Sequence, residues 1–322
     1  MEIIEKLKQV ELRGRGGAGF PTWQKWQMVK DASGVEKYVI CNVSEGEPAV
    51  AKDGYILEKW PQAVIDGIVL AMDAVGADKG YLYLRKDYFD KYKDSLAQIV
   101  GDKQIEITRE PGGYLGGEET ALLNSVEGGR CEPRIKPPFP PQVGLFRCPT
   151  LINNLETLYC AAKIAKGEYK NTRFYTISGD CACPGVFERG ESLTIKEILE
   201  KTGNLPESEF FVQAGGGASG AILLQNELDV PLSGAGSIVV HDKQKTDPCQ
   251  LGLQWINFFI NENCGKCVPC REGVYRLKEV FSQEPVDIAK AKEIVNLLAA
   301  ASFCPFGRGV ANSFGSLIDK LF

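Results

Sequence analysis

The stretch Tyr38-Val-Ile-Cys-Asn-Val43 decides the class of fold. It is a short and almost continuous apolar run, which is typical of a strand buried on both faces of a parallel sheet. Helix and strand patterns alternate after it, with helices expected over 61–75, 88–100 and 118–126 and strands over 80–84 and 104–108. This alternation predicts a parallel α/β sheet that is covered by helices on both faces.

The pattern changes in the second half of the chain. Short strand patterns, one helix over 195–201 and glycine-rich turns fill the region from 173 to 240, which predicts a small α+β module. From residue 248 onward the chain is expected to be helical, over 250–261, 273–281, 285–300 and 309–321. We therefore predict a multidomain α/β protein with domains at 1–172, 173–247 and 248–322.

Length and charge narrow the classes of function. The chain has 322 residues and a formal net charge of −5, and a dominant nucleic-acid partner would need a basic face instead. No apolar run is long enough to span a bilayer, and the N-terminus has no charged-then-apolar export pattern. We expect a cytoplasmic protein that binds no nucleic acid and does not insert into a membrane.

The cysteine content points to metal ligation by thiolates. Eleven cysteines are an odd number in a large chain, so a disulfide framework explains them poorly. The single histidine, His241, excludes zinc sites with two or three histidines and iron sites with two histidines and a carboxylate.

One run of cysteines has the spacing of an iron–sulfur site. Cys264, Cys267 and Cys270 form C-x2-C-x2-C, which wraps the backbone around three corners of a [4Fe–4S] cubane. Cys304, followed by a proline, supplies the fourth ligand if a helical hairpin over 273–300 returns the chain to the cluster. The alternatives are a zinc knuckle or buried structural cysteines. A knuckle pairs two C-x2-C units, whereas only one cysteine returns here.

The remaining seven cysteines suggest no second cluster. Cys181 and Cys183 form a C-x-C with Cys249 far away, and a fourth ligand is lacking. The other four are scattered and are expected to be small buried apolar residues: Cys41, Cys131, Cys148 and Cys160.

A glycine-rich loop lies near the N-terminus. Arg13-Gly-Arg-Gly-Gly-Ala-Gly-Phe-Pro21 contains G-x-G-x-x-G, but a helix pattern precedes it and no strand occurs before Tyr38. It therefore fails as a Rossmann fingerprint. The loop N–H groups, with Arg15 and Lys25, could hold a nucleotide or a phosphate. The alternative is a flexible glycine turn.

Polar residues occur where ligands of α/β sheets bind. Asn42, Glu45 and Glu47 lie at the end of the first strand, and the carboxyl ends of parallel strands form binding crevices. Glu118 and Glu119 begin a helix that follows a second glycine loop, residues 111–117. They are either plain helix caps or acceptors for an uncharged donor such as a carboxamide or a flavin N–H.

Two further segments are ambiguous on their own. Lys136-Pro-Pro-Phe-Pro140 is either a ligand-binding segment or a surface loop. Asn153 and Asn154 either cap the following helix or bind a ligand.

In this order the segments resemble one family. GRGGAGFPTxxKW, CNxxEGEP, GGYxxGEETALLNSVEG, RxKPPFPxxVGL, PTxxNNxET and CGKCxPCREG…CP look like the NADH-binding flavoprotein subunit of respiratory complex I, the 51 kDa subunit. That family includes the diaphorase subunits of soluble hydrogenases and formate dehydrogenases. The resemblance extends from residue 12 to residue 321.

The resemblance implies a fold and cofactor contacts. It implies a Rossmann-like FMN domain, a β-grasp (SLBB) domain and a helical bundle that holds the cluster. The implied FMN contacts are Gly14, Gly16, Gly17, Lys25, Asn42, Glu45, Gly117, Glu118, Asn153 and Asn154. The implied lining of the nicotinamide nucleotide site is Phe20, Glu47, Tyr114, Glu119, Lys136 and Phe139, with Phe20 stacking and the two glutamates positioning the carboxamide.

The resemblance also implies a reaction and partners. Hydride would pass between NAD(H) and the N5 atom of FMN, and single electrons would pass between flavin and cluster. The implied partners are a thioredoxin-like [2Fe–2S] subunit and a larger iron–sulfur subunit of a hydrogenase, a formate dehydrogenase, a bifurcating enzyme or a complex I-like assembly. Ser44 and Met28 depart from the family pattern. A relay subunit with a degenerate nucleotide site, or an NADP(H)-specific one, is therefore the alternative.

Overall fold

The computed structural model describes residues 2–34 and 36–322, and these form two compact units. The first unit comprises residues up to Gly46 together with Ala51–Thr172, and the second comprises Glu47–Val50 together with Arg173–Phe322. The expected division of the second unit near residue 247 stays a prediction.

The first unit is built on a parallel sheet in the strand order β3-β2-β1-β4. Its elements are α1 (Ile3–Gln9), α2 (Thr22–Asp31), β1 (Tyr38–Val43), α3 (Lys52–Lys59), α4 (Pro61–Val75), β2 (Lys79–Leu84), α5 (Lys86–Val100), β3 (Ile105–Arg109), the 3-10 turn η1 (Tyr114–Gly117), α6 (Glu119–Val126), η2 (Leu145–Arg147), β4 (Thr150–Asn154) and α7 (Leu155–Lys166). The predicted class of fold for this region is confirmed.

Helices cover both faces of this sheet. Leu122 and Leu123 of α6 pack with Ile40 and Ile152 on one face. On the other face α4 and α7 approach each other so closely that a Cβ on Gly67 would lie 2.2 Å from the carbonyl oxygen of Leu158. Because β1 lies between β2 and β4 within the sheet and between the two helical layers, it is apolar along almost its whole length.

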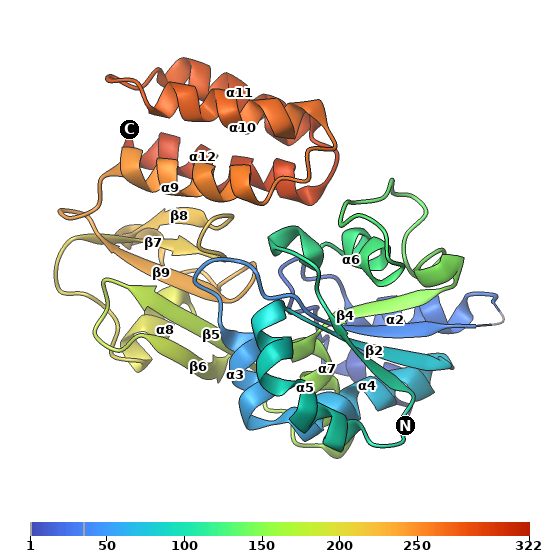
Figure 1. Ribbon diagram of the computed structural model, residues 1–322. Coiled ribbons are helices and arrows are strands. Elements are labelled where there is room, and N and C mark those ends of the chain that lie inside the picture. Colours follow the sequence, from blue (N-terminus) through green and yellow to red (C-terminus); the bar gives the residue numbers. More distant parts are fainter. Residues whose placement is uncertain (1, 35) are drawn as a thin grey trace. The chain divides into compact units, whose positions relative to one another are not determined.

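The second unit combines a mixed sheet with a helical region (Figure 1). Its elements are β5 (Thr172–Gly179), β6 (Gly185–Gly190), α8 (Ile195–Lys201), β7 (Phe210–Ala214), β8 (Ala221–Leu224), η3 (Gln225–Glu227), β9 (Ser237–Asp242), α9 (Pro248–Asn261), α10 (Val268–Phe281), α11 (Ile288–Ala301) and α12 (Pro305–Leu321). The strand order is β6-β5-β9-β7-β8, with β5 and β9 parallel and β7 antiparallel to both of its neighbours.

Packing in the second unit follows the sequence pattern. Ile195, Ile198 and Leu199 of α8 pack against the sheet, and Thr194 and Glu197 form a capping box at the start of that helix. Helices α9 to α12 lie together in Figure 1, and Ser316 of α12 accepts a hydrogen bond from the backbone N–H of Ile222 in β8 (2.8 Å).

The structure corrects several expected elements. The pattern predicted no strand at β4 or β8 and no helix at α3. Helices α10 and α12 begin at Val268 and Pro305, whereas the sequence predicted starts at 273 and 309. In both helices a proline occupies the first turn, where its missing N–H costs nothing. No helix among the described residues has the length and apolar character needed to cross a bilayer.

Candidate functional site

The glycine loop closes on itself and approaches the end of β4. Arg13 and Pro21 form a β-bridge, and the N–H of Gly14 donates to the carbonyl oxygen of Phe20 (2.9 Å). A Cβ on Gly16 would lie 3.2 Å from Cβ of Asn154, so a larger residue would press on this asparagine. The helix before the loop and the absence of a strand there are as predicted.

Arg15 anchors this loop to the body of the first unit. Its backbone N–H donates to Oγ1 of Thr157 (2.9 Å), and its Nη2 donates to the hydroxyl of Tyr169 (3.0 Å). The side chain is buried. Its predicted contribution to phosphate binding stays a prediction, whereas its contacts establish a structural role.

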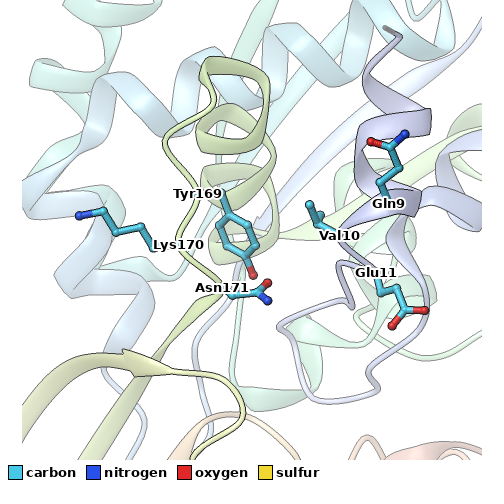
Figure 2. Close-up of a pocket in the computed structure, with 6 residues that line it drawn as sticks. All are labelled: Gln9, Val10, Glu11, Tyr169, Lys170 and Asn171. Atoms are coloured by element: carbon cyan, nitrogen blue, oxygen red, sulfur yellow. The ribbon is translucent and has the colours of Figure 1, made fainter.

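Tyr169 also lines a cavity of about 470 Å³ together with Gln9, Val10, Glu11, Lys170 and Asn171. Figure 2 shows these side chains, with the hydroxyl end of Tyr169 directed toward Asn171. None of the six residues belongs to the predicted flavin or nucleotide contacts. The cavity therefore lies between the segment that precedes the glycine loop and the segment of Tyr169, which Arg15 contacts.

The strand ends place three asparagines side by side. Asn42 of β1 and Asn154 of β4 are partners in the parallel register. The Nδ2 of Asn42 donates to the carbonyl oxygen of Gly117 (2.9 Å), which ties the second glycine loop to the end of β1. Oδ1 of Asn153 accepts from the indole of Trp26 (2.9 Å), which ties α2 to β4. Residues from four predicted segments thus converge at one edge of the sheet.

The two lysines of this edge pair with the two glutamates at the start of α6. Lys25 forms an ion pair with Glu119 and donates to the carbonyl oxygen of Ile152 (3.1 Å). Lys136 lies 2.5 Å from Oε1 of Glu118. Each lysine is thus paired with a carboxylate, and an anionic ligand that binds at this edge could pair with the lysine instead.

Glu118 also caps α6. Its carboxylate accepts from the backbone N–H groups of Thr120 (3.0 Å) and Ala121 (2.9 Å). The capping interpretation of Glu118 is therefore correct, and it leaves Oε1 for a ligand or for Lys136.

Glu45 is buried and fixed rather than exposed to a ligand. Its carboxyl group accepts from the N–H groups of Asp53 (2.8 Å) and Gly54 (3.2 Å) and from the hydroxyl of Tyr88 (2.7 Å). Burial, with a contribution from the nearby Asp53 carboxylate, raises the pKa of Glu45 to about 7. The direct FMN contact that the resemblance implied for this residue stays a prediction.

The aromatic residues assigned to the nucleotide site are differently placed. Phe20 and Phe139 are 44% and 48% exposed, which leaves both rings available for stacking. Tyr114 begins η1, and its Cα would lie 2.7 Å from a Cβ on Gly46. This close approach ties the second glycine loop to the end of the segment after β1.

Glu47 belongs to the second unit. Its Oε1 accepts hydrogen bonds from the N–H groups of Ala218 and Ser219, each at 2.9 Å, and the residue is buried. Its predicted contact with the carboxamide stays a prediction.

Three of the four predicted cluster ligands lie at the starts of two helices, and Cys264 lies in the loop between α9 and α10. Cys267 is the N-cap of α10 and Cys270 is in its first turn, while Cys304 is the N-cap of α12. A Cβ on Gly307 would lie 3.0 Å from Cβ of Cys270, so the two first turns are in contact. The partial positive charge of two helix N-termini stabilises an anionic thiolate site.

The pKa of the Cys270 thiol depends on burial and on the other three cysteines. Burial raises the pKa of Cys270 to about 12, with further contributions from Cys267, Cys304 and Cys264. Asn263 donates to the sulfur of Cys270 (3.2 Å) and its Oδ1 accepts from the N–H of Gly265 (2.8 Å). This donor to sulfur is of the kind that surrounds iron–sulfur clusters.

The donor set fits a cubane. Four cysteines with no imidazole or carboxylate match the ligands of a [4Fe–4S] cluster, in which each iron takes one thiolate. In the described part of the chain no three His, Cys, Asp or Glu side chains converge on a single ion position. Thiolates on separate corners of a cubane do not need to converge in that way.

Sequence reasoning missed the charged residues beneath the sheet edge. Lys52, Asp53 and Glu156 are buried and contact the partly buried Asn154 or one another. The sequence carries no signal for this, because lysine and aspartate are expected at the surface.

Together, the two sites define a class of protein: one that binds a nucleotide-type cofactor at a parallel sheet edge and an iron–sulfur cluster between helix starts. Residues 7–163 match the Nuo51 FMN-binding domain, and residues 250–321 match the NADH-ubiquinone oxidoreductase-F iron–sulfur binding region.

Relatives and solved structures agree with these matches. The chain is 35% identical to the F 2 subunit of the NADH-quinone oxidoreductase of Rhizobium meliloti, over 96% of this chain and 84% of the relative. It is also 35% identical to the alpha subunit of the NAD-reducing hydrogenase HoxS of Cupriavidus necator, over 84% of this chain and 50% of that one. A crystal structure of an NAD+-reducing [NiFe]-hydrogenase in the H2-reduced state superposes with a TM-score of 0.90 at 31% identity, over 99% of this chain and 61% of that chain.

The chain therefore belongs to the family of the FMN- and [4Fe–4S]-binding 51 kDa subunit of complex I, which also has members in NAD-reducing hydrogenases. The family resemblance seen in the sequence, the multidomain α/β fold and the two cofactors are thereby confirmed.

Proposed function

We propose that this chain is the NADH dehydrogenase (diaphorase) subunit of a multisubunit oxidoreductase. In this function, hydride passes between NAD(H) and FMN, and single electrons pass through the [4Fe–4S] cluster. The observation that carries the proposal is the presence, in one chain, of a sheet edge where polar residues converge and of four cysteines at and just before two helix starts. A relative is named an NADH-quinone oxidoreductase subunit, which supports NAD(H) as the nucleotide.

FMN, when bound, accepts hydride and exchanges electrons one at a time, which the side chains of the protein cannot do. The chain supplies binding, orientation and electrostatics. Residues proposed to hold FMN are Gly14, Arg15, Gly16, Gly17, Lys25, Asn42, Glu45, Gly117, Glu118, Asn153 and Asn154. Those proposed to hold the nicotinamide nucleotide are Phe20, Glu47, Tyr114, Glu119, Lys136 and Phe139.

The pairing of lysines and glutamates suggests how the edge accepts charged ligands. Lys25 and Lys136 are neutralised by Glu119 and Glu118 in the protein alone. A phosphate group can take over a lysine, which leaves the carboxylate to accept a hydrogen bond from a carboxamide or hydroxyl group. Exchange of partners in this way keeps each lysine beside an anion and gives the released carboxylate a hydrogen-bond donor.

The electrons require acceptors or donors outside this chain. We propose a thioredoxin-like [2Fe–2S] subunit and a larger iron–sulfur subunit as partners, in a complex I-like, hydrogenase, formate dehydrogenase or bifurcating assembly. Membership of a family whose named relatives are subunits of such enzymes supports a multisubunit setting. The cytoplasmic location expected from the sequence stays a prediction.

An anaerobic optical titration tests the proposal. The FMN-loaded protein is titrated first with NADH and, in a separate sample, with NADPH, while the flavin absorbance is followed. We expect NADH to bleach the flavin and NADPH to do so more weakly, because Glu47 and Glu119, which are proposed to line the nucleotide site, disfavour an additional phosphate. Bleaching by NADPH alone would make the protein NADP(H)-specific, and bleaching by neither would make it a relay subunit.

A further inference from the structure

Four ionisable side chains are buried together below the sheet edge. Nζ of Lys52 lies 2.5 Å from Oδ1 of Asp53 and 3.0 Å from Oε2 of Glu156, and none of these three side chains is more than 3% exposed. Glu45 joins them, because its carboxyl group accepts from the N–H of Asp53. Three carboxyl groups therefore share one buried cation in this cluster, which we call the Lys52 cluster.

The Lys52 cluster fixes both ends of the Asn154 amide. Nδ2 of Asn154 donates to Oδ2 of Asp53 (2.5 Å), and Oδ1 accepts from Nζ of Lys52 (3.2 Å) and from the backbone N–H of Glu156 (3.0 Å). The amide can satisfy these partners in only one orientation. Because Cβ of Asn154 lies next to Gly16, the cluster is one side chain away from the glycine loop.

Stability alone does not account for such a cluster. A buried ion pair often contributes no more to folding than apolar residues of the same volume. Here the carboxyl groups outnumber the cation, which is a further cost. Burial raises the pKa of Asp53 and of Glu45, while the surrounding carboxylates outweigh burial and raise the pKa of Lys52. Above pH 7, where Glu45 has also lost its proton, the cluster carries more negative than positive charge, and this charge acts on any neighbouring group whose charge changes, because charges interact strongly in a medium of low dielectric constant.

We infer that Lys52, Asp53 and Glu156 are positioning residues for FMN: they orient Asn154, and the negative charge of their cluster lowers the reduction potential of the bound flavin. The inference rests on the proposed placement of FMN beside Asn154. Reduction of FMN by two electrons and one proton adds one negative charge to it, and nearby carboxylates disfavour that addition. The electrons come from NADH, which is oxidised to NAD+ with loss of a hydride.

Two substitutions each remove one negative charge and replace the side chain by one of nearly the same shape and volume. Glu156→Gln keeps the contacts of Asn154 with Asp53 and Lys52 and with the backbone N–H of residue 156. Asp53→Asn keeps a group of the same shape next to Lys52. The matched control is Glu106→Gln, which removes one carboxylate that is 52% exposed in the same unit and is therefore screened by solvent.

Spectroelectrochemistry of the FMN-loaded full chain at fixed pH measures the flavin potential, and electron paramagnetic resonance follows the cluster separately. For each FMN form the protein has an affinity, and we compare the ratio of the affinity for reduced FMN to that for oxidised FMN. We expect this ratio to be higher in Glu156→Gln and in Asp53→Asn than in the wild type, by a factor on the order of ten. This factor corresponds to a rise of about 30 mV in the two-electron potential. Glu106→Gln should leave the potential unchanged.

The outcomes separate this inference from the proposed site. If the potential of Glu156→Gln equals that of the wild type, or shifts no more than that of Glu106→Gln, the electrostatic role is wrong. Asp53→Asn provides the same test if Glu156→Gln does not fold. If the wild type binds FMN but Asn154→Ala binds it equally well, the placement of FMN at Asn154 is wrong instead. A purely structural role would alter FMN binding in the cluster variants but not the potential of the flavin that remains bound.

Discussion

Replacement of Glu45 by glutamine should change how the stability of the protein depends on pH. Burial and the Asp53 carboxylate raise the pKa of Glu45 from 4.5 to about 7 in the folded protein. The folded state therefore binds a proton between these two pH values, whereas the unfolded state does not. The stabilisation from this proton is complete below pH 4.5 and is lost as the pH rises to about 7.

The structure gives the size of the effect. Each tenfold change in proton affinity corresponds to about 1.4 kcal/mol, so the raised pKa is equivalent to about 3 kcal/mol across that range. For a domain of about 150–250 residues, such as the first unit, 1 kcal/mol shifts the unfolding temperature by about 2–4 °C. Glutamine resembles the protonated carboxyl group and does not lose its proton. Because its Nε2 cannot accept the hydrogen bonds that Oε2 of Glu45 accepts from Gly54 and Tyr88, the variant starts below the wild type near pH 5, and its stability relative to the wild type should rise by about 3 kcal/mol toward pH 8.

Thermal unfolding of the FMN-free protein, followed between pH 5 and pH 8, measures this difference. Glu106→Gln is the control, because its carboxylate is half exposed and should not alter the pH profile. A constant difference between Glu45→Gln and the wild type at every pH would refute the reasoning, since it would show that the carboxyl group does not titrate in this range. A variant that is less stable at pH 8 than at pH 5 relative to the wild type would refute it as well.

Three other perturbations have definite expected outcomes. Burial lowers the pKa of His241 to about 4, so the stability that this neutral side chain contributes above pH 6.5 should be lost as the pH falls toward 4. His241→Asn should therefore reduce the fall in unfolding temperature between pH 6.5 and pH 4. Gly16→Val should weaken FMN binding at least tenfold in fluorescence titrations, because even the Cβ of the new side chain would press on Asn154, a proposed FMN contact. The control Gly112→Ala adds a Cβ in open space and should bind FMN normally. Cys304→Ala should lose the [4Fe–4S] signal in electron paramagnetic resonance while Cys183→Ala, an exposed thiol, retains it, and an intact signal in the first variant would remove Cys304 from the ligand set.

Patterns of burial explain which parts of the fold the sequence predicted. The apolar run at β1 was sufficient for the parallel sheet, because a central strand covered on both faces must be apolar. The strand β4 was not predicted, because Thr150-Leu-Ile-Asn-Asn154 is short and ends in two asparagines, which are rare in strands. These asparagines are tolerated at the carboxyl end of the strand, where they bond to Trp26 and to the Lys52 cluster.

The candidate site was predictable only where chemistry leaves a local pattern. The cysteine spacing and the glycine loops are such patterns, and the capping role of Glu118 follows from its place before a helix. The Lys52 cluster leaves none, because Glu156 is about 100 residues from the other members and each of them would ordinarily be at the surface. The assignment of Glu47 to the second unit was also beyond the sequence, since its backbone partners Ala218 and Ser219 are about 170 residues away.

The most direct test of the account is reduction of the cluster by NADH through the flavin. NADH is added anaerobically to the full chain with and without bound FMN, and the [4Fe–4S] cluster is followed by electron paramagnetic resonance. The account predicts a signal of the reduced cluster with FMN present and none without it. A cluster that stays oxidised in the FMN-loaded protein, although a strong chemical reductant reduces it, would contradict the claim that this chain joins hydride chemistry to one-electron transfer.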